Sequence, residues 1–160
     1  MTIQVGDKLP SVELWYKDED GVKSINSDEL FAGNRVVVFA LPGAYTPTCS
    51  ASHVPGYVVH ADEILARGVD RIVCLSVNDA FVMGAWGEQQ NVEDRVMMIA
   101  DGSAHFTRAV GLDLDLDARG MGIRSQRYAM VVNDGVVELL NVEQPGEFKV
   151  SDAETILASL

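Results

Sequence analysis

The sequence is poor in basic residues and has no apolar run of membrane length. Twelve lysine and arginine residues stand against 24 aspartate and glutamate residues, which gives a net charge of −12. Binding to nucleic acid is therefore not expected, because it depends on clustered Lys and Arg. No apolar run approaches the roughly 20 residues of a membrane-spanning helix, and the N-terminal segment lacks the basic and apolar regions of a signal peptide. We therefore expect a cytoplasmic protein that binds neither nucleic acid nor a membrane.

Cysteine is also scarce, since Cys49 and Cys74 are the only two. Their separation excludes a Cys-x-x-Cys motif, and with no export signal they are expected to be thiols rather than a disulfide. The three histidines, His53, His60 and His105, share no ligand spacing with the cysteines. The sequence therefore predicts neither a metal site nor a cofactor.

Length and hydrophobic pattern predict one domain over residues 1–160 with an α/β fold. Strands are expected at 12–15, 22–25, 36–41, 72–77, 96–100, 128–132 and 136–140, and helices at 27–33, 49–67, 79–86, 105–110 and from 151 onward. The first two strands form an N-terminal hairpin, and Asn133-Asp-Gly135 marks a second hairpin. The continuously apolar strand 36–41 is expected to be buried on both faces. This order predicts a thioredoxin-like fold, in which helices flank a mixed central sheet.

Several residues mark the boundaries of the expected helices. Ser27 is expected to cap the helix that starts there. Ser151 and Glu154 have the spacing of a capping box at the start of the last helix. Pro55 is expected to kink the helix over 49–67, because proline removes a backbone hydrogen bond.

The acidic segment Asp113-Leu-Asp-Leu-Asp117 resembles the beginning of a calcium-binding loop. Its sixth position is Ala118 instead of glycine, and its twelfth is Arg124 instead of glutamate, so the ligand pattern of an EF-hand is broken. We therefore expect an acidic surface loop here.

Cys49 follows the segment Leu41-Pro-Gly-Ala-Tyr-Thr-Pro-Thr48, where a buried strand ends and a helix begins. The unpaired N–H groups at a helix start favour negative charge, and the thiolate is the nucleophilic form of cysteine. Free cysteine is also commonly buried as a small apolar side chain. The position of Cys49 by itself leaves both interpretations open.

Pro42, Thr46 and Cys49 make the pattern P-x-x-x-T-x-x-C, which resembles the signature of peroxiredoxins. Together with His53-Val-Pro-Gly56, the stretch is similar to the type II (peroxiredoxin-5-like) subgroup. The resemblance extends over nearly the whole chain, through the segments 75–79, 81–86, 100–103 and 124–130. It implies a thioredoxin-like fold and a thiol peroxidase that reduces hydrogen peroxide and small alkyl hydroperoxides in antioxidant defence.

The resemblance also implies a role for each residue of the motif. Cys49 would be the peroxidatic nucleophile, Thr46 would orient the peroxide through its hydroxyl, and Pro42 would shield the site from water. Arg127 matches the arginine that holds the thiolate and polarises the peroxide, because the departing oxygen needs fixed donors. Arg124, three residues upstream, is a less favoured second cation.

His53 follows Cys49 by four residues, which makes the two side chains neighbours on an unbroken helix. That spacing could serve the Cys-His dyad of a hydrolase. No glycine-rich oxyanion motif accompanies it, however, and the type II sequence has a histidine at this position. We interpret His53 as a supporting or packing residue, with the dyad as the alternative.

The sulfenic acid formed on Cys49 must be reduced before another turnover. Some type II relatives use a second cysteine near the C-terminus, but residues 141–160 contain none. Cys74 is expected to be a buried strand residue, and a resolving role would require local unfolding because disulfide geometry is strict. The resemblance therefore favours recycling by an external thiol, glutathione or glutaredoxin, with thioredoxin as the rival.

Three aromatic residues, Tyr45, Phe81 and Trp86, would line a homodimer interface by resemblance, or else pack in the core. Two alternatives to the peroxidase remain. A thioredoxin-like disulfide oxidoreductase is disfavoured, because Cys49-Ser-Ala-Ser52 offers no nearby second thiol. In a peroxide-sensing redox relay protein, Cys49 would be oxidised once to signal to another protein.

Overall fold

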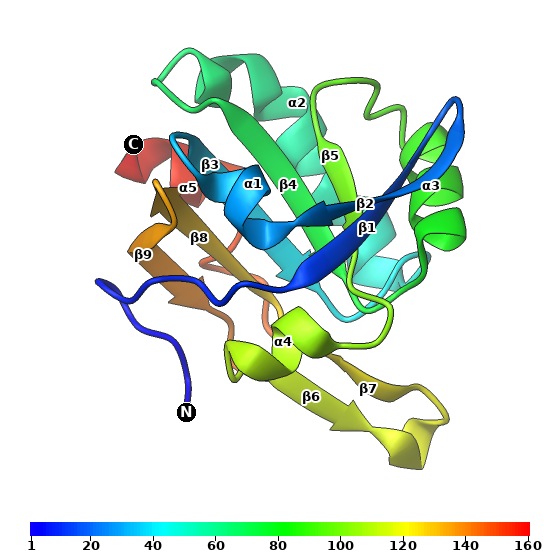
Figure 1. The fold of residues 1–160 in the computed structure, drawn as a ribbon. Helices are drawn as coiled ribbons and strands as arrows, with labels where there is room; N and C mark the ends of the chain where they lie inside the picture. Colours follow the sequence, from blue (N-terminus) through cyan, green and yellow to red (C-terminus); the bar gives the residue numbers. More distant parts are fainter.

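The computed structural model describes residues 1–160 and has a seven-stranded sheet with the order β2-β1-β5-β4-β3-β8-β9 (Figure 1). Its strands are β1 (Glu13–Asp18), β2 (Gly21–Asn26), β3 (Arg35–Leu41), β4 (Arg71–Ser76), β5 (Met97–Ala100), β8 (Tyr128–Asn133) and β9 (Val136–Val142). β3, β4 and β5 are parallel, whereas β1 and β8 run antiparallel to β5 and β3. The predicted thioredoxin-like fold with a mixed sheet and an N-terminal hairpin is confirmed.

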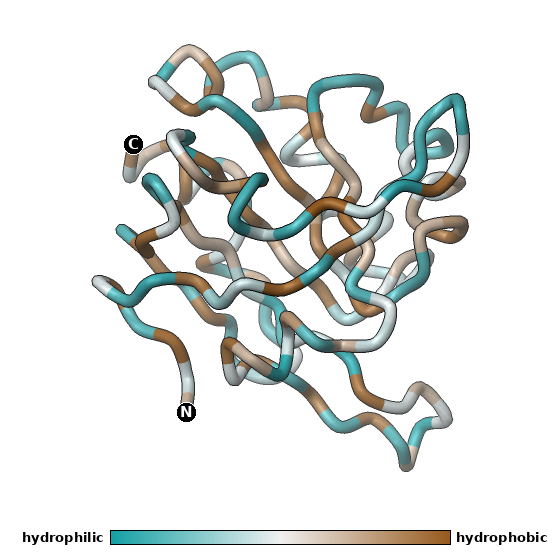
Figure 2. The backbone as a smooth tube through the Cα atoms, viewed as in Figure 1, coloured by the Kyte–Doolittle hydropathy of each residue, from teal (hydrophilic) through white to brown (hydrophobic).

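Helices cover both faces of this sheet (Figure 1). One face carries α2 (Val54–Leu65), α3 (Ala80–Gln89) and α5 (Ala153–Ser159), and the other carries α1 (Ser27–Phe31) and α4 (His105–Ala109). From Val36 to Leu41, successive residues of β3 point alternately into the two cores, which explains why this strand has no polar residue after Arg35. Figure 2 shows the hydrophobic segments along the central strands and hydrophilic ones at the β1–β2 turn. No helix combines the length and the apolar character needed to cross a bilayer.

The acidic segment expected to be a surface loop is instead a strand. β6 (Asp113–Leu116) pairs antiparallel with β7 (Gly122–Ser125) through a short 3-10 turn, and this pair projects from the main body (Figure 1). The expectation of a loop was wrong because Asp-Leu-Asp-Leu alternates polar and apolar residues. Its aspartates are exposed and its leucines half-buried, which is the period-two pattern of a strand with one covered face.

Two helix caps differ from those expected. Asn26, rather than Ser27, caps α1, and Asp152, rather than Ser151, caps α5. In both places the serine is buried and its hydroxyl bonds another segment of the chain. Ser, Asp and Asn are nearly equal as N-caps, so the sequence does not decide between adjacent candidates.

The helix that begins after β3 changes its geometry before Pro55. Residues 47 and 48 are helical, Cys49–His53 form a π-helical turn, and α2 begins at Val54. The Val54 N–H donates to the Cys49 carbonyl, five residues back. The irregularity expected at Pro55 therefore takes the form of a wide helical turn that ends just before it.

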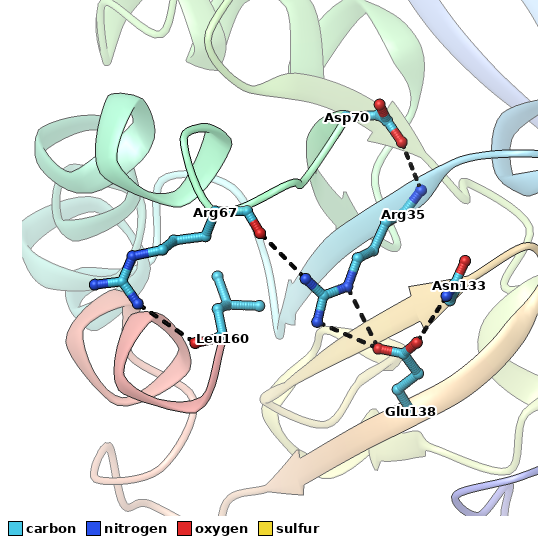
Figure 3. Close-up of polar contacts among 6 residues, drawn as sticks. All are labelled: Arg35, Arg67, Asp70, Asn133, Glu138 and Leu160. Carbon is cyan, nitrogen blue, oxygen red and sulfur yellow. Dashed lines mark hydrogen bonds and ion pairs between the residues drawn. The ribbon is translucent and has the colours of Figure 1, made fainter.

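Polar contacts fix the amino end of β3 (Figure 3). The Arg35 guanidinium donates to the Arg67 carbonyl at 3.2 Å and to the Glu138 carboxylate at 3.4 Å, and the Arg35 N–H donates to Asp70 at 2.8 Å. Such partly exposed ion pairs add little stability individually. The network joins the end of α2 to β3 and β9, and the opposite end of β3 leads into the segment 42–49.

Candidate active site

The candidate active site lies at the carboxyl end of β3. Because β8 runs antiparallel to β3, with Ala40 opposite Tyr128, the residue before β8 lies beside the segment that follows β3. Cys49 on that segment and Arg127 just before β8 meet there, although 78 residues separate them in the sequence. The topology thus unites two of the four predicted site residues from distant parts of the chain.

Cys49 and Arg127 are in direct contact. Nη2 of Arg127 donates a hydrogen bond to the Cys49 sulfur at 3.1 Å, and the cysteine is buried. The guanidinium places a positive donor at the sulfur, and the unpaired N–H groups of the helix start add partial positive charge nearby. The position combines two features that make a cysteine nucleophilic.

Thr46 and Pro42 lie on the segment between β3 and the helix. The Thr46 hydroxyl donates to the Gly43 carbonyl at 2.7 Å. Because the Thr46 hydroxyl already donates its proton in this bond, its oxygen can only accept a hydrogen bond from another O–H group. Pro42, four residues earlier in the chain, is half-buried. The segment thus carries a fixed acceptor and a partly covered apolar ring immediately before the cysteine.

Arg124 contacts the backbone of this segment instead of the cysteine sulfur. Its Nη1 donates to the Pro42 carbonyl at 3.3 Å, and its Nε donates to the Met121 carbonyl at 2.9 Å. A Cβ atom at position 43 would lie 2.5 Å from Arg124 Nη1, so Gly43 leaves the space in which the guanidinium lies. Arg124 therefore supports the loop that carries Pro42 and Thr46.

His53 connects Arg127 to the loop before α5. Its Nδ1 lies 2.7 Å from Arg127 Nη1, and its Nε2 lies 3.1 Å from the Ser151 carbonyl. A carbonyl only accepts, so Nε2 carries the proton and Nδ1 accepts from the arginine. Burial, with the Arg127 charge as the second cause, lowers the pKa of His53 to about 3. His53 is thus a neutral acceptor for Arg127, and the alternative Cys-His dyad is not formed.

Aromatic rings enclose the Arg127–His53 pair. The Phe148 ring centroid lies 5.7 Å from Arg127 Cζ and 4.9 Å from the His53 ring, and Phe39 lies 5.0 Å from His53. An aromatic face attracts a guanidinium, and excluding water strengthens the hydrogen bonds of the charge. Phe148 was not predicted from the sequence, because it lies in a loop distant from the motif and no local pattern marks it.

Ser50, next to Cys49, is held by α3 and the residue that follows it. In a π-helical turn the Ser50 carbonyl would be bonded by residue 55, but that residue is proline and has no N–H. Gln90 Nε2 donates to this carbonyl at 3.2 Å instead, and Trp86 Nε1 donates to the Ser50 hydroxyl at 3.2 Å. The turn that carries the cysteine is thereby fixed to the neighbouring helix.

The three aromatic residues expected at an interface are not equivalent in the structure. Trp86 is fully buried, whereas Tyr45 is 51% exposed and Phe81 is 67% exposed. The Tyr45 and Trp86 ring centroids are 6.2 Å apart. Core packing therefore accounts for Trp86, whereas Tyr45 and Phe81 are exposed aromatic side chains.

Cys74 is fully buried in β4, where it lies opposite Phe39 and Met98. Burial raises the pKa of the Cys74 thiol, with the proximity of Cys49 as a smaller cause. Both cysteines are free and belong to the same apolar cluster. No group of three or more His, Cys, Asp or Glu side chains could hold a metal ion.

The chain is similar to a known protein family and to individual proteins along nearly its whole length. The family model described as Redoxin matches residues 4–157. The chain is 50% identical to "Peroxiredoxin-2E-2, chloroplastic" of Oryza sativa subsp. japonica, covering 99% of this chain and 73% of the rice protein.

Two solved structures are similar over the full length. Reduced Prx3 from Vibrio vulnificus, in complex with hydrogen peroxide, has a TM-score of 0.95 and 54% identity, with 99% of each chain covered. A Burkholderia cenocepacia protein described as a putative thioredoxin reductase has a TM-score of 0.98 and 56% identity, with 100% of this chain and 99% of that chain covered. Both likenesses include the segment that carries Cys49.

Proposed function

The chain belongs to the Redoxin family and is a type II peroxiredoxin, a thiol peroxidase, and from this premise we propose that Cys49 is its peroxidatic nucleophile. The observation that carries the proposal is the hydrogen bond of 3.1 Å from Arg127 Nη2 to the Cys49 sulfur. It supplies a fixed positive donor at the atom that attacks and at the place where the peroxide must bind.

In the proposed reaction, the Cys49 thiolate attacks one oxygen of a peroxide ROOH. The S–O bond forms as the O–O bond breaks, and the proton of the attacked oxygen passes to the departing oxygen, which leaves as ROH. Arg127 stabilises the charge on the departing oxygen, and Thr46 accepts a hydrogen bond that orients the peroxide. Pro42 limits the access of water. The substrates are hydrogen peroxide and small alkyl hydroperoxides.

We infer recycling by an external thiol in a one-cysteine mechanism. Cys74 supports this, because it is fully buried in a central strand that pairs with β3 on one side and β5 on the other. Its sulfur could reach Cys49 only if the site unfolded locally. One thiol would attack the sulfenic acid, forming a mixed disulfide with Cys49 and releasing water. A second thiol would attack this mixed disulfide, releasing the Cys49 thiol and leaving the two external thiols joined as a disulfide. Glutathione or glutaredoxin is the proposed reductant, with thioredoxin as the rival.

We also propose a homodimer and a single peroxiredoxin domain over residues 1–160. The exposed rings of Tyr45 and Phe81 support the dimer, because aromatic residues are enriched at protein interfaces. The cytoplasmic location expected from the sequence stays a prediction, since similar proteins include chloroplastic and mitochondrial ones.

Intact mass measurement tests the assignment of Cys49. One equivalent of hydrogen peroxide, added to the reduced protein without another thiol, should add one oxygen to the wild type and to Cys74→Ser. Cys49→Ser should gain no oxygen and should have no peroxidase activity. Retained activity in Cys49→Ser would refute the assignment, and loss of two hydrogens within one wild-type chain would show that Cys74 resolves Cys49.

The same proteins distinguish the peroxidase from the two alternatives. Repeated consumption of peroxide with glutathione, or with glutathione and glutaredoxin, supports rapid turnover. A single round of oxidation would favour a peroxide-sensing relay protein. Reduction of a protein disulfide without peroxide would favour a disulfide oxidoreductase, for which the chain lacks a Cys-x-x-Cys pair.

A further inference from the structure

We propose that Glu143 is a positioning residue of the peroxidatic site and acts on Arg127 through Ser151 and His53. The inference rests on the proposed roles of Cys49 and Arg127. Glu143 directly follows β9, and its carboxylate faces the loop that leads to α5.

The Glu143 carboxylate is buried and surrounded by donors. It accepts the N–H groups of Lys149 at 2.8 Å, Val150 at 2.9 Å and Ser151 at 2.9 Å, and the Ser151 hydroxyl at 2.7 Å. Burial acts to raise the pKa of Glu143, but these hydrogen bonds outweigh it and lower the pKa. The carboxylate is therefore ionised and determines the path of residues 149–151.

The next connection is the Ser151 carbonyl. It accepts hydrogen bonds from His53 Nε2 at 3.1 Å and from the Tyr57 hydroxyl at 2.8 Å. A carbonyl oxygen has two lone pairs, so both are used. Because Glu143 binds the N–H and the hydroxyl of the same serine, it fixes the residue whose carbonyl selects the His53 tautomer.

Glu143 also holds the backbone of Arg127. Its N–H donates to the Arg127 carbonyl at 2.9 Å. The contacts therefore form a closed circuit, from the Arg127 backbone through Glu143, Ser151 and His53 to the Arg127 guanidinium. The same loop carries Phe148, which lies against the guanidinium. Glu143 thus holds the arginine at both ends: its backbone N–H bonds the Arg127 carbonyl directly, and its carboxylate acts on the guanidinium through Ser151 and His53.

Loss of this carboxylate should free the Ser151 carbonyl to turn away from His53. His53 could then carry its proton on Nδ1, where it would face the N–H of Arg127. Two donors pointing at each other would displace the guanidinium from the Cys49 sulfur. The expected consequence is a slower reaction with peroxide, because displacement of a catalytic group by ~1 Å can cost on the order of 10²-fold.

Glu143→Gln tests the proposal, because it keeps the side-chain size but removes two of the acceptor lone pairs. Glu147→Gln is the matched control, since Glu147 lies on the same loop and only approaches Lys149 Nζ at 3.6 Å on the surface. The ring nitrogens of His53 are observed by ¹⁵N NMR in the reduced proteins. The rate of Cys49 oxidation is measured by rapid mixing with hydrogen peroxide.

Glu143→Gln should shift His53 from the pure Nε2–H tautomer and slow oxidation by roughly 10- to 100-fold, whereas Glu147→Gln should change neither. An unchanged tautomer would overturn the proposal, whatever the rate. If Glu143→Gln does not fold, Ser151→Ala should give a smaller change in the same direction, and no change would overturn the proposal. The tautomer is observed without peroxide, so this outcome is independent of whether Cys49 is the nucleophile.

Discussion

Acidification should destabilise the protein through His53. The pKa of this histidine falls from its ordinary value of 6.5 to about 3 on folding, mainly because it is buried. Between these values the unfolded chain binds a proton that the folded protein does not bind, so the free energy of unfolding decreases as pH falls below 6.5. Each pH unit below 6.5 lowers the free energy of unfolding by about 1.4 kcal/mol. The total loss near pH 5 is therefore about 2 kcal/mol. For a chain of this length that corresponds to a lowering of Tm by roughly 4–8 °C.

Urea unfolding at about pH 7.5 and about pH 5 measures this effect in the wild type and in His53→Gln, which cannot titrate at that position. The fluorescence of the two tryptophans reports the transition. The loss between the two pH values should be about 2 kcal/mol larger in the wild type. A constant stability difference between the proteins cancels in this comparison. Equal losses of stability in the wild type and in His53→Gln would refute the interpretation that His53 is buried and neutral.

Glu143 also affects the pH dependence of the free energy of unfolding, but at lower pH than His53 does. It therefore does not disturb the comparison between about pH 7.5 and about pH 5. The pKa of Glu143 is lowered from 4.5, so the stability it contributes is present above that value and is lost as pH falls through the folded pKa. The two groups act in the same direction but mostly in different pH windows. Stopping near pH 5 therefore isolates the histidine.

Arg127→Ala should slow formation of the Cys49 sulfenic acid by about 10²–10³-fold, because a single fixed donor to a developing oxyanion has that effect on rate. Stopped-flow fluorescence measures it, and an unchanged rate would remove Arg127 from the mechanism. Cys74→Ser should leave turnover with glutathione largely intact, because Cys74 is buried and protonated. Loss of glutathione-supported peroxide consumption in a folded variant would make Cys74 the resolving cysteine.

The sequence predicted the central strands well, because their side chains report burial directly. β3 is apolar at nearly every position, and only a strand covered on both faces requires that. The hairpin of β8 and β9 was equally clear, since Asp134 and Gly135 both adopt positive φ at its turn. The β6–β7 pair was missed because two short half-buried strands resemble a polar loop unless their alternation is counted.

The site was predictable only as far as the motif reaches. Cys49, Thr46 and Pro42 are close in the sequence, and Arg127 was found by resemblance. Glu143 was missed, although its position follows the alternation of β9: Leu139 packs against the core cluster that contains Cys49, and Glu143 is four residues further on the same face. A glutamate on a core-facing position indicates a buried carboxylate with dedicated donors.

The hydrogen-bond partners of Arg127 explain how its positive charge stays available to the buried Cys49 sulfur in a chain of net charge −12. A carboxylate bound directly to the guanidinium would neutralise it and weaken its attraction for the Cys49 thiolate. A protonated histidine would repel it. The neutral His53 ring accepts its hydrogen bond without adding charge. The negative charge of Glu143 is instead taken up by the donors of the 149–151 loop, and it has the smallest of the effects on the His53 pKa. The arginine is thus held firmly while its charge stays available to the sulfur.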